Sequence, residues 1–509
     1  MTHKAARPLV VVHYHWRPGG VRRVIETALP ALVRRGFFSR VTLAGGEAPD
    51  ETWLASLRAA MGEVVLEAKV FPSFAYRTAR PASPPVGDVH EDCARLLAGE
   101  RGDTTVWAHN LALGRNAPLA SALAGVAKRG DAVLLSHHHD LLFDNRWGHW
   151  EAVQADGFGD LRSLAEAFFP AGPRIAHLCV NRSDHALIEQ GLGARAVYVP
   201  NPVMLAATRD GAEAVAGRSS GQGVMTSGKF WLMPCRLMRR KNIAEAVMLA
   251  RWFAPGTQVV TTGGTSSPEE REYASCLVDA ASLSGWPLRL SVLPAKAGAS
   301  CVMAWMAQAD AVVSTSLREG FGLTAYEACL AGRPLLARAT ADLPDSALPG
   351  AVLYDDVMVP DELFDRAAEV KRQQLLWDRW RKSLPLPARD WAGRPALLDG
   401  ESGPAAFSRL TLRAQAELLT HPDDVLCAAL DRLNPVLAKR GQSGLPATVP
   451  MDGESFTAEK FAERFIVGLE RAEMEDCRDA RASMRVLEAF LAARLAGDNF
   501  YPLLCPDET

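Results

Sequence analysis

The sequence predicts an α/β protein with two Rossmann-like domains in tandem and a mostly helical C-terminal extension. The first observation is length, because 509 residues exceed what one hydrophobic core usually supports. The second is that short, almost continuously apolar segments alternate with helical patterns, in two separate series. The third is that this alternation stops near residue 371. Apolar strands separated by helices are typical of a parallel sheet covered on both faces.

The first series assigns residues 1–204 to an N-terminal domain. After an initial strand, a Pro-Gly-Gly turn leads into a helix expected over residues 21–35. The expected strands lie at 9–12, 41–44, 104–107, 132–135, 175–180 and 196–199. Residues 205–229 are rich in Ala, Gly and Ser and poor in large apolar residues, so they are expected to be a linker.

The second series assigns residues 230–384 to a second Rossmann-like domain. Its expected strands lie at 230–233, 258–261, 288–292, 311–313 and 334–337, with a helix at 243–253. In two such domains, ligands bind where strand ends and helix starts converge, so we expect the domains to face a cleft. Residues 385–509 form the extension, which begins with a Pro- and Gly-rich stretch and is mostly amphipathic helix, for example over 457–471.

Composition favours a soluble globular protein in the cytoplasm. The net charge of -3 gives no electrostatic reason to expect nucleic acid as a partner. Nine cysteines are scattered singly without a C-x-x-C pair, a pattern of reduced thiols rather than of disulfides or zinc ligands. A polar start predicts no signal peptide, and the lack of a long apolar run predicts no transmembrane helix. Peripheral membrane contact stays open.

A glycine-rich turn between two glutamates is the most informative motif. Glu319 opens the segment Glu-Gly-Phe-Gly, which follows an expected strand and precedes a helical run from Leu323. Glu327 falls about one turn into that helix, so both carboxylates can face the same site. The glycines allow a ligand to approach the backbone, and the helix start supplies N–H donors for a phosphate. The alternative is a capped surface helix with two solvated glutamates.

A basic loop lies just past the first strand of the second domain. Arg236 and Lys241 flank this loop before the helix at 243–253, and both can reach phosphate oxygens. The alternative is a solvated basic loop capped by Asn242. In the first domain, Gly19 and Gly20 enter a helix directly after the first strand. This turn suits close approach of a substrate, but it is equally explained as a tight connection.

Three adjacent histidines, His137, His138 and His139, end a strand and precede Asp140. Successive strand residues point to opposite faces, so these three side chains cannot easily converge on one metal ion. We therefore expect no metal here. One histidine that faces the cleft and is oriented by a carboxylate is the better interpretation.

Together these four elements resemble the family 4 glycosyltransferases, which have the GT-B fold and are retaining enzymes. The resemblance covers about residues 8 to 355, and its most specific parts are the E-x7-E pair and the R-x4-K pair. It implies that Arg236 and Lys241 hold the donor diphosphate and that Glu327 binds the ribose hydroxyls. It also implies that Glu319 contacts the transferred sugar.

The resemblance extends to the residues around these four. Contacts to the sugar and diphosphate are implied for Phe321, Gly322, Leu323 and Thr324, and an approach to diphosphate and acceptor for Gly19 and Gly20. His139 resembles the histidine that contacts the transferred sugar, with His138 as the second choice. The chain departs from the family after Pro334, where residues 339–345 replace a Gly-rich loop, and its extension is longer than in most members. In the GT-B fold the chain returns to the first domain, which implies that part of 385–509 packs there.

The implied mechanism needs no enzyme nucleophile. Departure of the diphosphate is stabilised by cations and helix N–H groups, and the leaving phosphate oxygen takes the acceptor proton on the same face. The predicted catalytic residues are His139, Arg236, Lys241 and Glu319. No cofactor or metal is demanded, and the co-substrate is a UDP-, GDP- or ADP-linked sugar.

The acceptor is much less defined than the donor. Polar residues around the first-domain loops, among them His15, Arg17, Arg115 and Arg146, suit a small polar acceptor that carries phosphate or carboxylate. The alternative is that these arginines form surface ion pairs. Glycan and lipid-linked acceptors stay open, as does the oligomeric state. Two other functions are weighed: a GT-B glycan phosphorylase or epimerase, and a non-catalytic nucleotide-sugar-binding or scaffold protein. The ribose-type Glu327 argues against the phosphorylase.

Overall fold

The computed structural model describes residues 6–77, 88–98, 104–203, 228–265, 267–294, 299–340, 343, 348–400, 402–448, 456–474 and 479–505. The chain forms two compact units. Unit 1 comprises residues 1–203, 382–392 and 454–496, and unit 2 comprises 204–381, 393–453 and 497–509. The C-terminal extension is therefore divided between the two units. Residues 204–227, most of the expected linker, lie outside the described residues.

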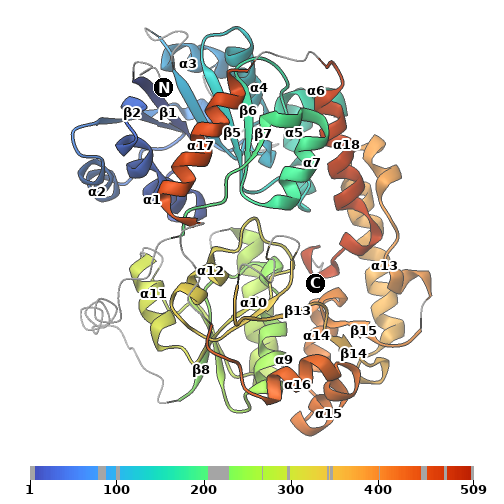
Figure 1. Cartoon of the computed structure of the whole chain (residues 1–509). Coiled ribbons are helices and arrows are strands. Elements are labelled where there is room, and N and C mark those ends of the chain that lie inside the picture. Colours follow the sequence, from blue (N-terminus) through green and yellow to red (C-terminus); the bar gives the residue numbers. More distant parts are fainter. Residues whose placement is uncertain are drawn as a thin grey trace. The chain divides into compact units, whose positions relative to one another are not determined.

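Unit 1 is built on a seven-stranded parallel sheet in the order β3-β2-β1-β4-β5-β6-β7 (Figure 1). The order reverses direction at β1, so the loops after β1 and β4 diverge at the carboxyl edge, where ligands bind in open α/β sheets. Its strands are β1 (Arg7–Val12), β2 (Phe38–Gly45), β3 (Val65–Val70), β4 (Thr105–His109), β5 (Val133–His138), β6 (Ile175–Cys179) and β7 (Ala196–Tyr198).

Helices cover both faces of this sheet. One face packs on α1, α2 and α17 through a core that includes Leu9, Val11 and Trp107. The helix α17 comes from the C-terminal part of the chain and lies over β5 and β6 (Figure 1). The helices of unit 1 are α1 (Gly20–Arg34), α2 (Glu51–Met61), α3 (Val89–Leu96), α4 (Ala117–Lys128), α5 (Trp150–Ala155), α6 (Leu161–Phe168), α7 (Arg182–Leu192), α17 (Ala458–Ala472) and α18 (Ala482–Leu495).

Unit 2 is built on a six-stranded parallel sheet in the order β10-β9-β8-β11-β12-β13. Alternate strand residues, such as Trp231 and Met233, join a core with the helix α9, while Phe230 on the other face makes an edge-to-face contact with Trp305 of α11. The strands are β8 (Phe230–Met233), β9 (Gln258–Thr261), β10 (Leu288–Arg289), β11 (Ala311–Ser314), β12 (Leu335–Arg338) and β13 (Val352–Tyr354).

The helices of unit 2 come from both halves of its sequence. In the first half they are α9 (Ile243–Phe253), α10 (Pro268–Ser284), α11 (Ala299–Gln308) and α12 (Leu323–Leu330). After the sheet follow α13 (Arg366–Ser383), α14 (Leu412–Leu418), α15 (Asp423–Leu433) and α16 (Pro435–Gln442), with a two-stranded antiparallel sheet of β14 (Met358–Val359) and β15 (Ala405–Ala406). Helices α14, α15 and α16 pack on α9, so this part of the extension completes the core of unit 2.

The two parallel sheets confirm the predicted fold class. Each expected strand is present within a few residues, but β3 and β13 were not predicted. β3 is an edge strand in which only Leu66 is buried, so it lacks the apolar run that identifies a covered strand. Among the described helices, none combines the length and hydrophobicity needed to span a lipid bilayer. The predicted cleft between the domains stays a prediction.

Candidate functional site

Two loops leave neighbouring strands at the carboxyl edge of the sheet in unit 2. β8 ends at Met233 and continues through a 3-10 turn, Arg239–Lys241, into α9. β11 ends at Ser314 and continues through residues 315–322 into α12. Since β8 and β11 pair in parallel, both loops start side by side at the same edge. The two motifs predicted to bind a donor are therefore neighbours in space.

Hydrogen bonds hold the two loops together. The buried hydroxyl of Thr315 shares its one proton between the carbonyl of Lys241, at 2.8 Å, and that of Asn242, at 2.9 Å. The backbone N–H of Leu317 donates to the carbonyl of Arg240 at 2.8 Å. Because buried backbone groups are costly to leave unpaired, these bonds fix the position of the basic turn relative to the glycine-rich loop.

A carboxylate and two cations meet where the loops touch. Glu319 forms ion pairs with the ammonium of Lys241 and, at 3.0 Å, with Nη1 of Arg240. Arg240 also donates to the carbonyl of Arg318 at 2.9 Å. Burial by itself would raise the pKa of Glu319, but Lys241 and Arg240 outweigh it and lower this pKa to about 2. Glu319 is therefore ionised and is paired with the cations that a diphosphate would need.

Arg240 belongs to this cluster, although no sequence motif marks it. It stands between Arg239 and Lys241 in a run of three cations, and no pattern in the sequence shows which of them turns toward Glu319. Arg236 takes a different partner. Its guanidinium pairs with Glu270 in the first turn of α10, and its side chain is about half exposed. The structure thus joins Lys241 directly to Glu319, whereas Arg236 contacts the next helix.

The start of α12 is shaped by two unusual residues. Gly322 has a φ of 79°, a left-handed conformation that favours glycine, and an added Cβ would lie 2.9 Å from Leu343. Phe321 is buried and stacks on Tyr326 with ring centroids 4.7 Å apart. Thr324 donates to the carbonyl of Pro234 at 3.4 Å, another link to the loop after β8. The first turn of α12 therefore starts beside both loops.

Glu327 lies on α12 and is buried, with 2% of its surface exposed. The structure therefore does not support the alternative of a solvated surface glutamate at this position. Its position one turn into the helix agrees with the spacing on which the sequence analysis relied. Leu323 is the first residue of the same helix and is half-buried.

A buried ionic network contacts Asn242, the residue that follows the basic turn. Glu245 is fully buried in the first turn of α9 and pairs with Arg338 of β12. It also accepts a hydrogen bond from the hydroxyl of Tyr354 at 3.0 Å and one from the amide of Asn242. Asn242 adopts a left-handed conformation with φ 49°, which such side-chain bonds stabilise. This network connects the residue after Lys241 to the strands β12 and β13.

In unit 1 the predicted acceptor residues lie on loops at the carboxyl edge of the sheet. Nε2 of His15, after β1, lies 3.2 Å from the hydroxyl of Tyr76, which follows β3. Arg115, after β4, lies over the ring of Tyr76 at 5.0 Å. Burial raises the pKa of Tyr76, and Arg115 opposes this shift in part. His15 and Arg115 thus converge on a tyrosine that the sequence analysis did not identify, because nothing in its local pattern marks it.

The other predicted residues of this edge have their own partners. Arg17 is exposed and pairs with Glu47, and Arg146 pairs with Asp140 at 3.0 Å. These pairs match the alternative in which the arginines form surface ion pairs. Gly19 and Gly20 begin α1, and an added Cβ on Gly20 would meet no atom within 4 Å. The chain itself therefore does not require glycine at position 20.

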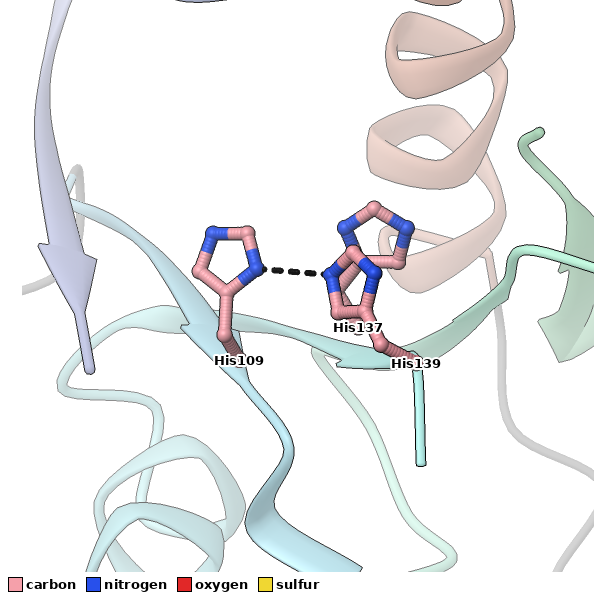
Figure 2. A group of neighbouring side chains, drawn as sticks. All are labelled: His109, His137 and His139. Atoms are coloured by element: carbon pink, nitrogen blue, oxygen red, sulfur yellow. Dashed lines mark hydrogen bonds between the residues drawn. The ribbon is translucent and has the colours of Figure 1, made fainter. Parts of the chain in front are cut away.

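The histidines at the end of β5 divide between the two faces of the sheet. His137 and His139 share one face, where His109 of β4 joins them (Figure 2). The Cα atoms of His109 and His137 are register partners. His138 lies on the opposite face, 2.9 Å from a ring nitrogen of His177. The expected alternation is therefore present, and the three adjacent histidines do not all face one point. His109 of the neighbouring strand, which the sequence analysis did not consider, joins two of them instead.

His139 is held by its neighbours on this face. Its Nε2 lies 3.0 Å from Nδ1 of His109, and its backbone N–H donates to the side chain of Asn110 at 2.9 Å. Burial lowers the pKa of His139 to about 4, although Asp140 counteracts this shift. The imidazole is therefore neutral near pH 7 and can donate or accept a hydrogen bond without a net charge.

Comparisons with known proteins agree with this arrangement. A family described as "Family 4 Glycosyltransferase in conflict systems" matches residues 244–381. The mannosylglucosyl-3-phosphoglycerate synthase of Petrotoga mobilis is 24% identical over 276 residues, which are 52% of this chain and 52% of that protein. The chain thus spans about half the length of this curated relative.

Solved structures share the architecture at low sequence identity. HepE of Anabaena in complex with UDP and glucose has a TM-score of 0.52 at 12% identity, covering 90% of this chain and 98% of that one. The sucrose-phosphate synthase of Thermosynechococcus elongatus has a TM-score of 0.50 at 14% identity, covering 90% and 97%. These likenesses show the fold. The fold is GT-B, and within unit 2 residues 244–381 are similar to the family 4 glycosyltransferases.

Proposed function

We propose that this protein is a retaining glycosyltransferase that moves a hexose from a nucleotide-diphosphate sugar to a hydroxyl of a polar acceptor. The observation that carries this proposal is the cluster of Glu319, Lys241 and Arg240 beside the first turn of α12. It combines cations, a carboxylate and helix N–H groups at the carboxyl edge of a parallel sheet, which is the chemistry that a sugar diphosphate requires.

The donor is proposed to bind unit 2. The diphosphate contacts Lys241, Arg236 and the N–H groups at the start of α12, and Glu327 accepts hydrogen bonds from the ribose hydroxyls. Negative charge grows on the diphosphate as the sugar leaves, so Lys241 and Arg236 stabilise the transition state more than the bound donor. The leaving phosphate oxygen then takes the proton of the acceptor on the same face. These side chains supply the positive charge that a metal ion would otherwise bring to the diphosphate.

Glu319 has a second task in this scheme. It is ionised, and it accepts hydrogen bonds from the hydroxyls of the transferred sugar once the diphosphate shares its cations. His139, which is neutral, is proposed to contact the transferred sugar.

The acceptor is proposed to bind the loops of unit 1 around Tyr76. His15 and Arg115 meet this tyrosine, and Arg146 lies on the loop after β5. The cationic side chains favour a small acceptor that carries a phosphate or a carboxylate. The name of the Petrotoga relative, whose product is a phosphoglycerate derivative, supports this acceptor class. The described cysteines are free thiols, which supports a cytoplasmic location.

A thermal-shift screen against UDP-, GDP- and ADP-linked sugars tests the donor, since a bound ligand raises the melting temperature by mass action. We expect one nucleotide class to stabilise the wild type and to stabilise Lys241→Met at least tenfold more weakly. Lys460→Met, which removes a lysine from an exposed ion pair in unit 1, is the matched control.

Transfer activity then separates an enzyme from a binding protein. With the donor found in the screen, release of free nucleoside diphosphate is measured with phosphorylated and carboxylated acceptors. Glu319→Ala should abolish release, and Lys460→Met should not change it. Donor binding without turnover on any acceptor would favour the non-catalytic alternative. Stabilisation by no nucleotide sugar would refute the donor assignment.

A further inference from the structure

Three buried histidines on one face of the unit 1 sheet form a compact set of nitrogen ligands. His109 ends β4, while His137 and His139 are two residues apart at the end of β5, so all three side chains project to the same side (Figure 2). Their exposed fractions are 1%, 0% and 8%. One ring nitrogen from each lies within 4.8 Å of the other two, and Nδ1 of His109 and Nε2 of His139 are 3.0 Å apart.

These distances are close to what a small metal ion needs. A tetrahedral Zn²⁺ with bonds of about 2.05 Å holds its nitrogen ligands ~3.3 Å apart. Nδ1 of His109 and Nε2 of His139 are close to this spacing at 3.0 Å, and the nitrogen of His137 lies within 4.8 Å of both. Neutral imidazole is the preferred ligand of Zn²⁺, Co²⁺, Ni²⁺ and Cu²⁺.

Unpaired ring nitrogens provide a second, independent observation. Nε2 of His109 and Nε2 of His137 are buried and have no hydrogen-bond partner in the part of the chain that the structure describes. The same is true of Nδ1 of His13, whose ring centroid lies 6.0 Å from that of His109. Buried polar atoms are nearly always paired, and several unpaired nitrogens at one place indicate a bound group.

A purely hydrogen-bonded cluster is the competing interpretation. In the present arrangement Nε1 of Trp107 donates to Nδ1 of His137 at 3.1 Å, and His109 and His139 share one hydrogen bond. This network leaves Nε2 of His137 without a partner, and an ion held by Nδ1 of His109 and Nε2 of His139 would supply one. Coordination through Nε2 of His137 would move its proton to Nδ1 and end the bond from Trp107. One indole hydrogen bond is then exchanged for a stronger metal–nitrogen bond.

We propose that His109, His137 and His139 bind one divalent transition-metal ion of the Zn²⁺ type, with a fourth position for water or for His13. The ion would tie the end of β4 to the end of β5 and fix the ring of His139. Its role is to position this edge of unit 1, and it takes no part in the charge stabilisation assigned to Lys241 and Arg236. The metal site does not depend on the proposed transfer reaction.

Metal titration of the full-length protein tests this inference. After treatment with a chelator, ZnCl₂ is added in competition with a chromophoric zinc indicator. We expect one tightly bound ion per chain, bound at least 100-fold more weakly by His109→Gln and by His139→Gln. His138→Gln is the matched control, because His138 is equally buried on the same strand but faces the other side of the sheet. Circular dichroism of each variant shows whether it is folded.

Spectroscopy on the wild type covers the case in which the buried variants do not fold. CoCl₂ should give the intense visible absorption of a four- or five-coordinate nitrogen site, and X-ray absorption of the zinc form should show the scattering pattern of three imidazoles. The proposal would be overturned if the wild type bound zinc only weakly, as exposed side chains do, and no ion were bound tightly. An equal loss in His138→Gln and His109→Gln, or zinc that His109→Gln retains at full affinity, would overturn it as well.

Discussion

Replacing Glu319 by Gln should strengthen the binding of a nucleoside diphosphate while it destroys sugar transfer. In the structure the carboxylate of Glu319 contacts Lys241 and lies 3.0 Å from Arg240. A diphosphate bound to the same ammonium must share it with this negative charge. Gln keeps the shape and the hydrogen-bonding capacity of the side chain but removes the charge. The two effects have opposite signs, which makes the prediction specific to this arrangement.

The expected gain follows from the repulsion between two anions on one cation. Each lies about 2.8 Å from the ammonium, so the carboxylate and the nearest phosphate oxygen are ~5.5 Å apart. At an effective dielectric constant of about 20 the repulsion is ~3 kcal/mol. The side chains of Glu319 and Lys241 are 11% and 13% exposed, so water and salt screen part of this energy. About 1–2 kcal/mol remain, a gain of roughly 5- to 30-fold in affinity.

The assay is isothermal titration calorimetry with the nucleoside diphosphate whose sugar conjugate stabilises the wild type best. Glu319→Gln is compared with the wild type and with Glu362→Gln, which removes a carboxylate from an exposed ion pair elsewhere in unit 2. The control should bind like the wild type. Raising the salt concentration should narrow the difference between Glu319→Gln and the wild type, since screening weakens the repulsion.

Weaker binding in Glu319→Gln would refute the reasoning. It would mean that the carboxylate orients Lys241 for the diphosphate rather than competing with it. Unchanged binding would show that the diphosphate does not use Lys241. Tighter binding with intact transfer would remove Glu319 from the catalytic residues but keep the electrostatic argument.

Three further predictions concern stability and the two glycine turns. The pKa of Glu319 falls from its ordinary 4.5 to about 2, so its charge stabilises the fold by about 3 kcal/mol above pH 4.5 and loses this contribution as pH falls toward 2. The difference in unfolding free energy between wild type and Glu319→Gln, measured in urea, should be constant from pH 8 to 5; a change within that range contradicts the assignment. Arg338→Met leaves the fully buried Glu245 without its cation and should lower the free energy of unfolding by about 3–5 kcal/mol. A double variant that also replaces Glu245 by Leu should lose less stability. Equal losses in the single and double variants would argue against this pair. Gly20→Ala should leave the melting temperature unchanged but reduce turnover, since no atom of the chain lies near the new methyl group. Gly322→Ala should lower both the melting temperature and the turnover because of the φ of 79° at this position. Full activity in Gly20→Ala would mean that no substrate approaches this residue.

Local patterns in the sequence were sufficient for the fold class and for most of the strands. The central strands, such as β1 and β8, are short apolar runs covered on both faces, and this burial is visible in composition alone. The edge strand β3 lacks such a run, because water covers much of its surface. The resemblance implied that part of the extension packs on the first domain, but which of its helices join which unit could not be predicted. Which unit a helix joins depends on the hydrophobic surface against which α14, α15 or α17 packs in the folded chain.

The candidate site also has a part that local sequence patterns predict and a part that they do not. The sequence by itself determined that Glu319, Gly322 and Lys241 lie where strands end and helices begin, because each follows an apolar run and precedes a helical one. Only the tertiary structure decided which groups meet there. Arg240 reaches Glu319 because β8 pairs with β11, and His109 joins His137 because β4 pairs with β5. Strand order brings together residues far apart in the chain, and no local pattern records that order.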